Sequence, residues 1–166
     1  MFLLSVKAGL RAKEIANLKW SMVVNSDGMV GPYINLTDNA SKGRSGRSIP
    51  INRDLKEQLK SMLEKARIHH GFDVSAANVI DSERGEQMSP QAVVNQFRKW
   101  YLELGLTGCS SHSGRRTFIT NAARKISTVG GSLRDVQFLA GHSSLNTTQR
   151  YIEGNSTARI KIVDLI

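Results

Sequence analysis

The sequence predicts an α+β fold, mainly helical, in which a small three-stranded antiparallel sheet packs against a helical bundle. Two observations predict the helices. Residues 52–70 place apolar side chains on one face at helical spacing, and residues 90–104 repeat that pattern after a Ser-Pro helix start. A third observation predicts the sheet, because residues 20–51 show short extended runs separated by polar, glycine-containing turns.

The opening of the chain is predicted to form two helices. Residues 1–7 are apolar and resemble the end of a buried helix, which Gly9 breaks. A second helix should run from about residue 10 to 19, with Ile15 and Leu18 on its inner face. Glu14 lies in the first turn of this helix, where a carboxylate suits the positive helix end.

The remaining elements follow from patterning and helix caps. The three strands are expected at residues 22–24, 33–36 and 48–51, with a polar hairpin loop at 37–46. Asn52 should cap the long helix that ends near residue 70. Later helices are expected at residues 90–104, 111–125, 133–140 and 144–151, and the apolar tail 157–166 is helical in pattern.

The length and composition of the chain limit the classes of protein to which it can belong. The 166 residues suffice for one domain, 1–166, with a hydrophobic core. The net charge of +9 favours a polyanionic partner, nucleic acid first and an anionic membrane surface second, although a basic surface kept for solubility would also carry it. Cys109, the single cysteine, excludes an internal disulfide and a cysteine zinc site. No stretch approaches the ~20 apolar residues of a membrane span, so a cytoplasmic protein is expected.

The stretch GHSSLNTTQRY, residues 141–151, carries an imidazole and a phenol, since His142 and Tyr151 lie nine positions apart. A phenol ordinarily titrates near ~10. To act as a nucleophile at neutral pH, it needs a base for its proton and cations that stabilise the charge on the electrophile. Ser143 and Ser144 directly follow the histidine, so neither can easily face its ring as an acyl-transfer nucleophile.

Three other segments supply such groups. Arg11 begins the second helix, and Lys42 lies in the hairpin loop with further arginines nearby. His112 and Arg115 are three residues apart, so they share a helix face. Taken singly, each has an ordinary structural interpretation, such as an exposed arginine, a solvated basic turn or a packed histidine.

Together the four segments, in this order, resemble the tyrosine recombinase (phage integrase) family. AGLRAKEIANLKW resembles its first-arginine motif, SKGRSGRSIP its β-hairpin lysine motif, and HSGRR its His-x-x-Arg box. LAGHSSLNTTQRY resembles its Leu-Gly-His to Tyr signature, including the nine-residue interval. The resemblance runs from about residue 3 to 152. Gly114 stands where the family usually has Leu, Ala140 stands where Leu is common, and the N-terminal core-binding domain of the family is absent from these residues.

The resemblance implies DNA strand cleavage by transesterification, with no cofactor, no catalytic metal and no small-molecule substrate. Arg11 and Arg115 would bind the scissile phosphate, and Lys42 would protonate the leaving 5′-oxygen. His112 would accept the proton that the attacking phenol loses.

The attacking group would be Tyr151, which becomes a 3′-phosphotyrosine, and His142 would hydrogen-bond the phosphate. Double-stranded DNA is the implied partner, with backbone contacts from Arg44, Arg47, Arg116 and Arg150. The family assembles as a tetramer on DNA through its C-terminal segment, so the tail 157–166 is a candidate linker in trans or a helix packed in cis. A bacterial or phage origin is expected.

Two other functions remain open at this stage. A type IB topoisomerase shares the Arg, Lys, Arg, His and Tyr chemistry, although His112 at the head of its box favours a recombinase. The chain is alternatively a truncated, non-catalytic DNA-binding remnant of an integrase. All six catalytic positions are filled, which disfavours decay of the chemistry.

Overall fold

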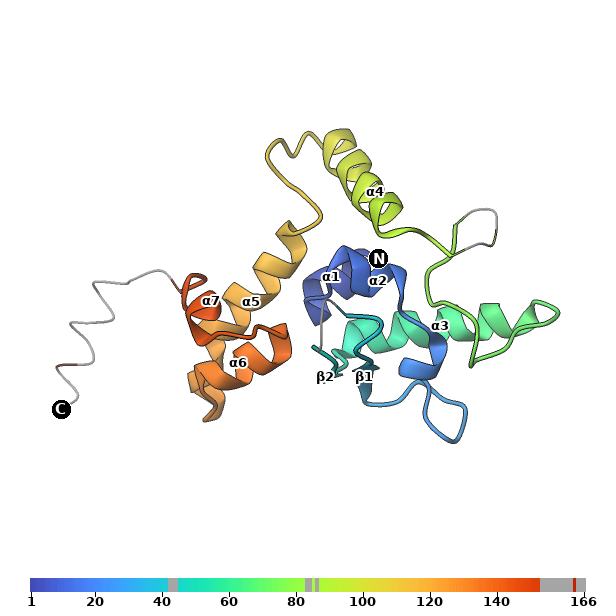
Figure 1. Cartoon of the computed structure of the whole chain (residues 1–166), viewed down its shortest axis with the longest axis horizontal. Coiled ribbons are helices and arrows are strands. Elements are labelled where there is room, and N and C mark those ends of the chain that lie inside the picture. Colours follow the sequence, from blue (N-terminus) through green and yellow to red (C-terminus); the bar gives the residue numbers. More distant parts are fainter. Residues whose placement is uncertain (42–44, 83–84, 86, 153–162, 164–166) are drawn as a thin grey trace.

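The computed structural model describes residues 1–41, 45–82, 85, 87–152 and 163. Helices dominate it and the sheet is small, so the predicted mainly helical α+β fold is confirmed. Figure 1 shows α5, α6 and α7 gathered on the left, α3 extending to the right, and α1 and α2 in the centre above the two strands. Lys42, Arg44 and, apart from Val163, the tail 157–166 lie outside the described residues.

The sheet of the described chain has two strands, so the prediction of three is wrong. β1 (Tyr33–Leu36) pairs antiparallel with β2 (Arg47–Pro50), with Ile34 opposite Ile49. The expected first strand is instead a 3₁₀ helix, η1 (Trp20–Met22), followed by a single bridge between Val24 and Val30. The reason is local hydrogen bonding. The backbone N–H groups of residues 23 and 24 both donate back to the carbonyl of the buried Trp20, which curls the chain.

The first four α-helices follow the predicted caps and breaks. α1 (Phe2–Ala8) ends at Gly9, and α2 (Ala12–Ala16) is shorter than expected. α3 (Arg53–Ile68) begins after Asn52, whose side chain accepts hydrogen bonds from two backbone N–H groups of the first turn. α4 (Pro90–Glu103) begins after Ser89, whose hydroxyl accepts from the N–H of Ala92.

All elements that follow α4 in the described chain are helices. They are α5 (Ser113–Lys125), η2 (Ile126–Val129), α6 (Leu133–Ala140) and α7 (Leu145–Gln149). The expected helices at 111–125, 133–140 and 144–151 are therefore confirmed to within two residues at each end. No helix of the described chain is long and apolar enough to span a membrane.

Two hydrophobic clusters hold these elements together. The larger one joins α1–α4 and the sheet around Trp20, Ile34 and Phe97. The smaller one joins α5, α6 and the end of α7 around Ile119, Val136 and Ala140. Burial of such side chains contributes about 1.5–3 kcal/mol each.

Gly114 lies where the two halves meet, because α1 packs against α5. A Cβ atom at this position would lie 2.5 Å from the hydroxyl oxygen of Ser5, which is itself fully buried. The small residue therefore permits the close approach of the two helices. A larger side chain at this position would collide with Ser5 unless the two helices moved apart.

Candidate active site

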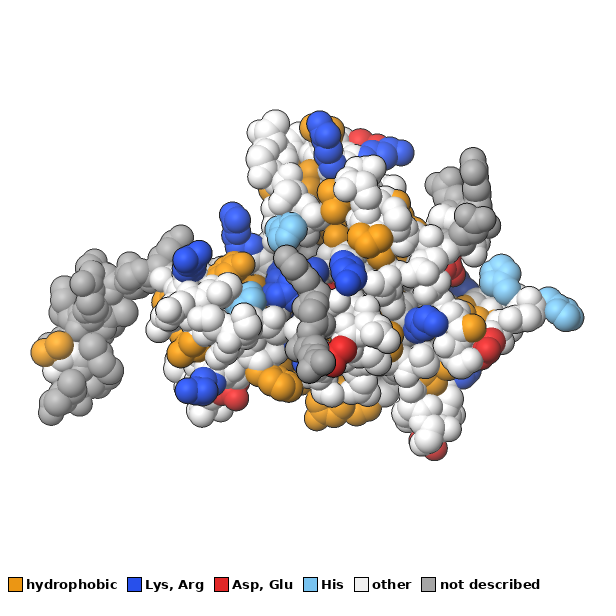
Figure 2. All heavy atoms as spheres, in the orientation of Figure 1, with side chains coloured by type: hydrophobic (Ala, Val, Ile, Leu, Met, Phe, Trp, Pro, Cys, Tyr) orange, Lys and Arg blue, Asp and Glu red, His pale blue; other side chains and the backbone are white. Residues whose placement is uncertain are grey.

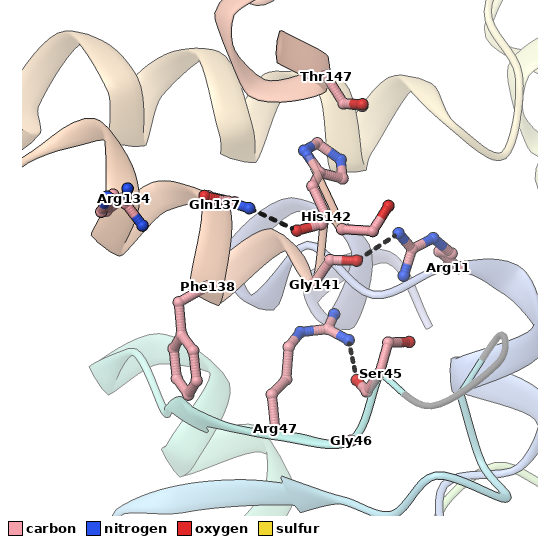
Figure 3. A pocket seen from close by; sticks show the side chains of 11 residues that line it. Arg11, Ser45, Gly46, Arg47, Arg134, Gln137, Phe138, Gly141, His142 and Thr147 are labelled. Atoms are coloured by element: carbon pink, nitrogen blue, oxygen red, sulfur yellow. Dashed lines mark hydrogen bonds between the residues drawn. The ribbon is translucent and has the colours of Figure 1, made fainter. Parts of the chain in front are cut away.

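The carboxyl end of α6 is the centre of the candidate site. Gly141 ends the helix with φ of 60°, a left-handed conformation that glycine adopts without strain. A Cβ atom here would also lie 2.7 Å from a guanidinium nitrogen of Arg47. A pocket of about 970 Å³ opens at this helix end, and its lining includes Arg11, Arg47 and His142. Figure 3 shows the side chains of Arg11 and Arg47 approaching Gly141 from different elements, while the His142 ring points toward Thr147.

Arg11 reaches the site from the start of α2. Its backbone N–H and its guanidinium both donate to the carboxylate of Glu14, at 2.8 Å each. Its second terminal nitrogen donates to the carbonyl of Gly141 at 3.1 Å. The predicted first-arginine segment is therefore joined directly to the His142 segment, 130 residues away in sequence.

Glu14 is fully buried beneath this arginine and holds a second one. Arg47 of β2 donates to both of its carboxylate oxygens, at 2.9 and 3.2 Å, and its own side chain is only 2% exposed. Burial alone would raise the pKa of Glu14. Hydrogen bonding and charge from Arg47, together with Arg11, outweigh burial and hold that pKa below its ordinary value.

Arg115 enters from α5 and is buried. One terminal nitrogen donates to the carbonyl of Gly9, and the other donates to the carbonyl of Ala140 at 2.6 Å. Burial lowers the pKa of this guanidinium to about 10, with the charge of Arg11 acting in the same direction. Arg115 therefore stays charged at neutral pH. The two predicted phosphate-binding arginines donate to adjacent carbonyls of one helix end.

His142 follows Gly141 and faces the last short helix. Its Nδ1 lies 3.0 Å from the hydroxyl of Thr148, a side chain with no exposed surface. Its ring stacks on that of Tyr151, with centroids 5.8 Å apart and planes 24° apart. Burial, with the charges of Arg115 and other arginines, lowers the pKa of His142 to about 4. The imidazole is therefore neutral at pH 7 and has a single N–H to donate.

Tyr151 completes this side of the site. It follows α7 and packs against the small hydrophobic cluster of α5 and α6. A phenolate at this position would raise the pKa of Arg115, so the two groups lie within electrostatic range. Four of the six predicted catalytic residues, Arg11, Arg115, His142 and Tyr151, are thus brought together from the two ends of the chain.

The remaining predicted residues differ in position. His112 is the exposed residue at the start of α5, where its Nδ1 makes one 3.5 Å contact with the hydroxyl of Ser111. Arg116 and Arg150 are exposed, as DNA-backbone contacts require. Arg47 is not: its burial against Glu14 removes it from the surface on which a backbone contact was expected.

Sequence reasoning missed two parts of the site. Glu14 was noted at the helix start and within the first-arginine motif, three residues after Arg11, but its pairing with Arg47 was not predicted. Arg134 of α6 lines the pocket with Phe138, one turn later on the same face, and nothing in the sequence marked this pair. Among the described residues, no group of three or more His, Cys, Asp or Glu side chains is placed to hold a metal ion.

Comparison with known proteins now decides the family. Residues 1–157 match the sequence model of the phage integrase family. The chain belongs to the phage integrase family. Among curated members it is similar to the tyrosine recombinase XerC of Proteus mirabilis, with 28% identity over 95% of this chain and 47% of that protein. It is 31% identical to the tyrosine recombinase XerA of Thermococcus onnurineus, over 91% of this chain and 49% of that protein.

Solved structures of family members share the fold. The crystal structure of XerA recombinase matches with a TM-score of 0.70 and 23% identity, over 98% of this chain and 55% of that one. The Tn1549 transposon integrase, solved with a circular intermediate DNA, matches with a TM-score of 0.73 and 15% identity, over 99% and 57%. The chain thus spans about half the length of the phage integrase relatives that it matches.

Proposed function

We propose that this chain cleaves and rejoins DNA strands through a covalent 3′-phosphotyrosine at Tyr151, in site-specific recombination. One observation carries the proposal. Three guanidiniums gather at the end of α6, and two of them, from Arg11 and Arg47, pair with the one carboxylate there, that of Glu14. Two positive charges are therefore in surplus beside a neutral imidazole and a phenol. A phosphodiester carries one negative charge and its pentacoordinate transition state carries two, so the surplus matches the transition state.

The arginines have distinct tasks in this chemistry. Arg11 lines the pocket and retains N–H donors beyond those that bind Glu14 and Gly141. These free donors can hydrogen-bond a non-bridging oxygen of the phosphate. Arg115 is buried behind it and adds positive charge where little solvent screens it. His142, neutral at pH 7, donates its single N–H to another oxygen. Arginine contacts to phosphoryl transition states are worth roughly 10³–10⁵ in rate.

The covalent step needs no reagent other than the protein and the DNA. The phenolic oxygen of Tyr151 attacks phosphorus while its proton passes to His112. The bond between phosphorus and the 5′-oxygen breaks, and Lys42 gives that oxygen a proton. Rejoining reverses these transfers with the same or another 5′-hydroxyl, so the energy of the bond is retained in the phosphotyrosine.

Duplex DNA is the partner that this proposal requires. Figure 2 shows Lys and Arg side chains spread over one face, in its centre, over the side formed by α5 to α7 and over α4. A lambda integrase dimer bound to a core site shares the fold, with a TM-score of 0.68, which supports the proposal. We further propose that Arg44, Arg116 and Arg150 contact the DNA backbone, and that four protomers assemble on DNA through the segment 157–166.

Covalent capture tests the function directly. The chain is incubated with nicked duplexes of randomised core sequence, in which departure of a short strand prevents rejoining, and covalent complexes are isolated under denaturing conditions. We expect capture of a restricted set of sequences, abolished in Tyr151→Phe and retained in Tyr33→Phe, which alters an exposed tyrosine of β1.

Other outcomes would identify the rival functions. Sequence-selective binding without capture would show a non-catalytic DNA-binding module. Capture without sequence preference, accompanied by relaxation of a supercoiled plasmid, would show a type IB topoisomerase.

A further inference from the structure

Three successive carbonyl groups at the end of α6 each accept a hydrogen bond from a different arginine. Leu139 accepts from Nε of Arg47 at 2.8 Å, Ala140 accepts from Arg115 at 2.6 Å, and Gly141 accepts from Arg11 at 3.1 Å. The arginines come from β2, α5 and the start of α2, which are remote in sequence. One helix end thus gathers all three guanidiniums.

The helix termination explains why these carbonyls are available. The N–H groups of Gly141 and His142 turn back to the carbonyls of Phe138 and Gln137. The next three carbonyls have no backbone donor within the described chain. Unpaired carbonyls at a helix C-terminus carry partial negative charge, so cations are stabilised there by up to about 2 kcal/mol in partly buried sites.

Arg47 differs from the other two arginines in what it connects. It donates to the helix end through Nε and to both oxygens of Glu14 through its terminal nitrogens. Glu14 in turn holds the backbone and the guanidinium of Arg11. Arg47 is therefore the link between α6 and the carboxylate that orients Arg11, and Figure 3 shows it directly beneath Gly141.

We propose that Arg47 is a positioning residue of the active site and not a contact to the DNA backbone. It fixes the carboxyl end of α6 relative to Glu14, so that Arg11, Arg115 and His142 face one phosphate in a fixed geometry. The inference rests on the proposed function, since positioning matters only if a phosphate reacts there. It replaces the sequence-based assignment of Arg47 to the DNA backbone.

Arg47→Lys separates the two roles. Lysine keeps the charge and can still contact a phosphate, but a single ammonium cannot span both oxygens of Glu14 and the carbonyl of Leu139. We expect the rate constant of covalent capture at saturating DNA to fall by about 10–100-fold, as loss of outer-shell support commonly does. The DNA concentration at half-saturation should not change. Arg53→Lys, an exposed arginine at the start of α3, is the matched control.

A rate at saturation equal to the wild type, with a higher half-saturating concentration, would overturn the proposal and restore a DNA contact. Thermal unfolding checks that the variant folds. If Arg47→Lys does not fold, Glu14→Asp gives the same test, because it keeps the carboxylate but shortens its reach by one methylene. This variant should likewise have a lower rate constant of capture at saturating DNA and an unchanged half-saturating DNA concentration.

Arginine side-chain NMR tests the positioning without DNA. The guanidinium N–H signals of Arg11 and Arg115 should be protected from exchange in the wild type, and should lose protection in Arg47→Lys but not in Arg53→Lys. Unchanged signals would overturn the positioning role. If the wild type captures no DNA yet these signals respond, the proposed function fails, although Arg47 still holds the two arginines in place.

Discussion

The two halves of the site differ in how firmly their functional groups are held. At the end of α6, each of the three arginines makes at least two hydrogen bonds to backbone carbonyls or to Glu14. On the other side, the Tyr151 ring stacks on His142 and packs against the small hydrophobic cluster, but no hydrogen bond of its hydroxyl is found within the described chain. His112 makes a single long contact with its neighbour.

Under the proposed function, this difference separates the groups that the folded chain holds in place without DNA from those that it does not. Stabilising charge in the transition state requires groups that are already oriented, because reorganisation during the reaction would cost the energy that catalysis needs. Buried arginines fixed by carbonyls meet that requirement. A nucleophile and its base need to meet only when the phosphate is present, so weaker anchoring on that side is tolerated.

The largest expected effect comes from the firmly held half. Arg115→Ala removes one buried positive charge and leaves the carbonyls of Gly9 and Ala140 without this donor. We expect covalent capture to slow by roughly 10³–10⁵ at saturating DNA, measured in a single turnover. Arg53→Ala removes an exposed arginine of α3 as the control.

If Arg115→Ala slows capture no more than Tyr33→Phe does, the firmly held half of the site does not contribute most to the rate. Such a result would mean that the arginines at the end of α6 stabilise the fold only. Circular dichroism separates the expected slowing from simple unfolding of the variant.

Glu14→Gln should have the next largest effect, on stability. The substitution removes a fully buried carboxylate that pairs with Arg11 and Arg47, and breaking such a pair costs about 3–5 kcal/mol. Urea unfolding at pH 7 measures it, with the exposed Glu57→Gln as control. Because the folded pKa of Glu14 lies below its ordinary value, its contribution is complete above about pH 4.3 and is lost as the pH falls further. The two unfolding curves should therefore converge in acid, and a constant gap would contradict the role of the charge.

Part of this arrangement could be predicted from the sequence. Helix starts at Asn52 and Ser89 follow from local capping chemistry, which needs no knowledge of tertiary contacts. The strand at residues 22–24 could not be judged in this way, because hydrogen bonds back to Trp20 compete with extended pairing. The motif spacings brought Arg11, Arg115, His142 and Tyr151 into one hypothesis, and the fold places them at one helix end.

The buried carboxylate network was harder to predict for a physical reason. Arg47 and the buried Ile49 are two residues apart in β2, so their side chains lie on the same, inward face of the sheet. This alternation was available in the sequence. A charge is expected on the surface unless a partner is known, and the partner, Glu14, lies 33 residues earlier on another element. Only the tertiary structure shows that the two meet.

Thr148→Val tests the weaker half at a smaller scale. The fully buried hydroxyl of Thr148 lies 3.0 Å from Nδ1 of His142, and valine keeps the shape while removing the oxygen. Without it, the imidazole loses the contact that orients its other nitrogen toward the phosphate, and we expect about a tenfold slower capture, in line with loss of outer-shell support. Thr147→Val, an exposed neighbour that also lines the pocket, tests whether the buried position matters. Equal losses in the two variants would argue against an orienting role for Thr148.

The smallest expected effect is the acid sensitivity of the fold that His142 produces. Its pKa is about 4 in the folded chain and about 6.5 ordinarily, so between these values the unfolded chain binds a proton that the folded chain does not. Stability should therefore fall as the pH drops from 6.5 to 4, and His142→Gln should make that part of the curve shallower. The difference should be on the order of 1 kcal/mol, because solvent screens the partly exposed ring. Urea unfolding at intervals of half a pH unit measures it, and His69→Gln, at an exposed position after α3, controls for loss of an imidazole. A His142→Gln curve parallel to the wild type over this range would show that neither burial nor the nearby guanidiniums lower the pKa of this imidazole.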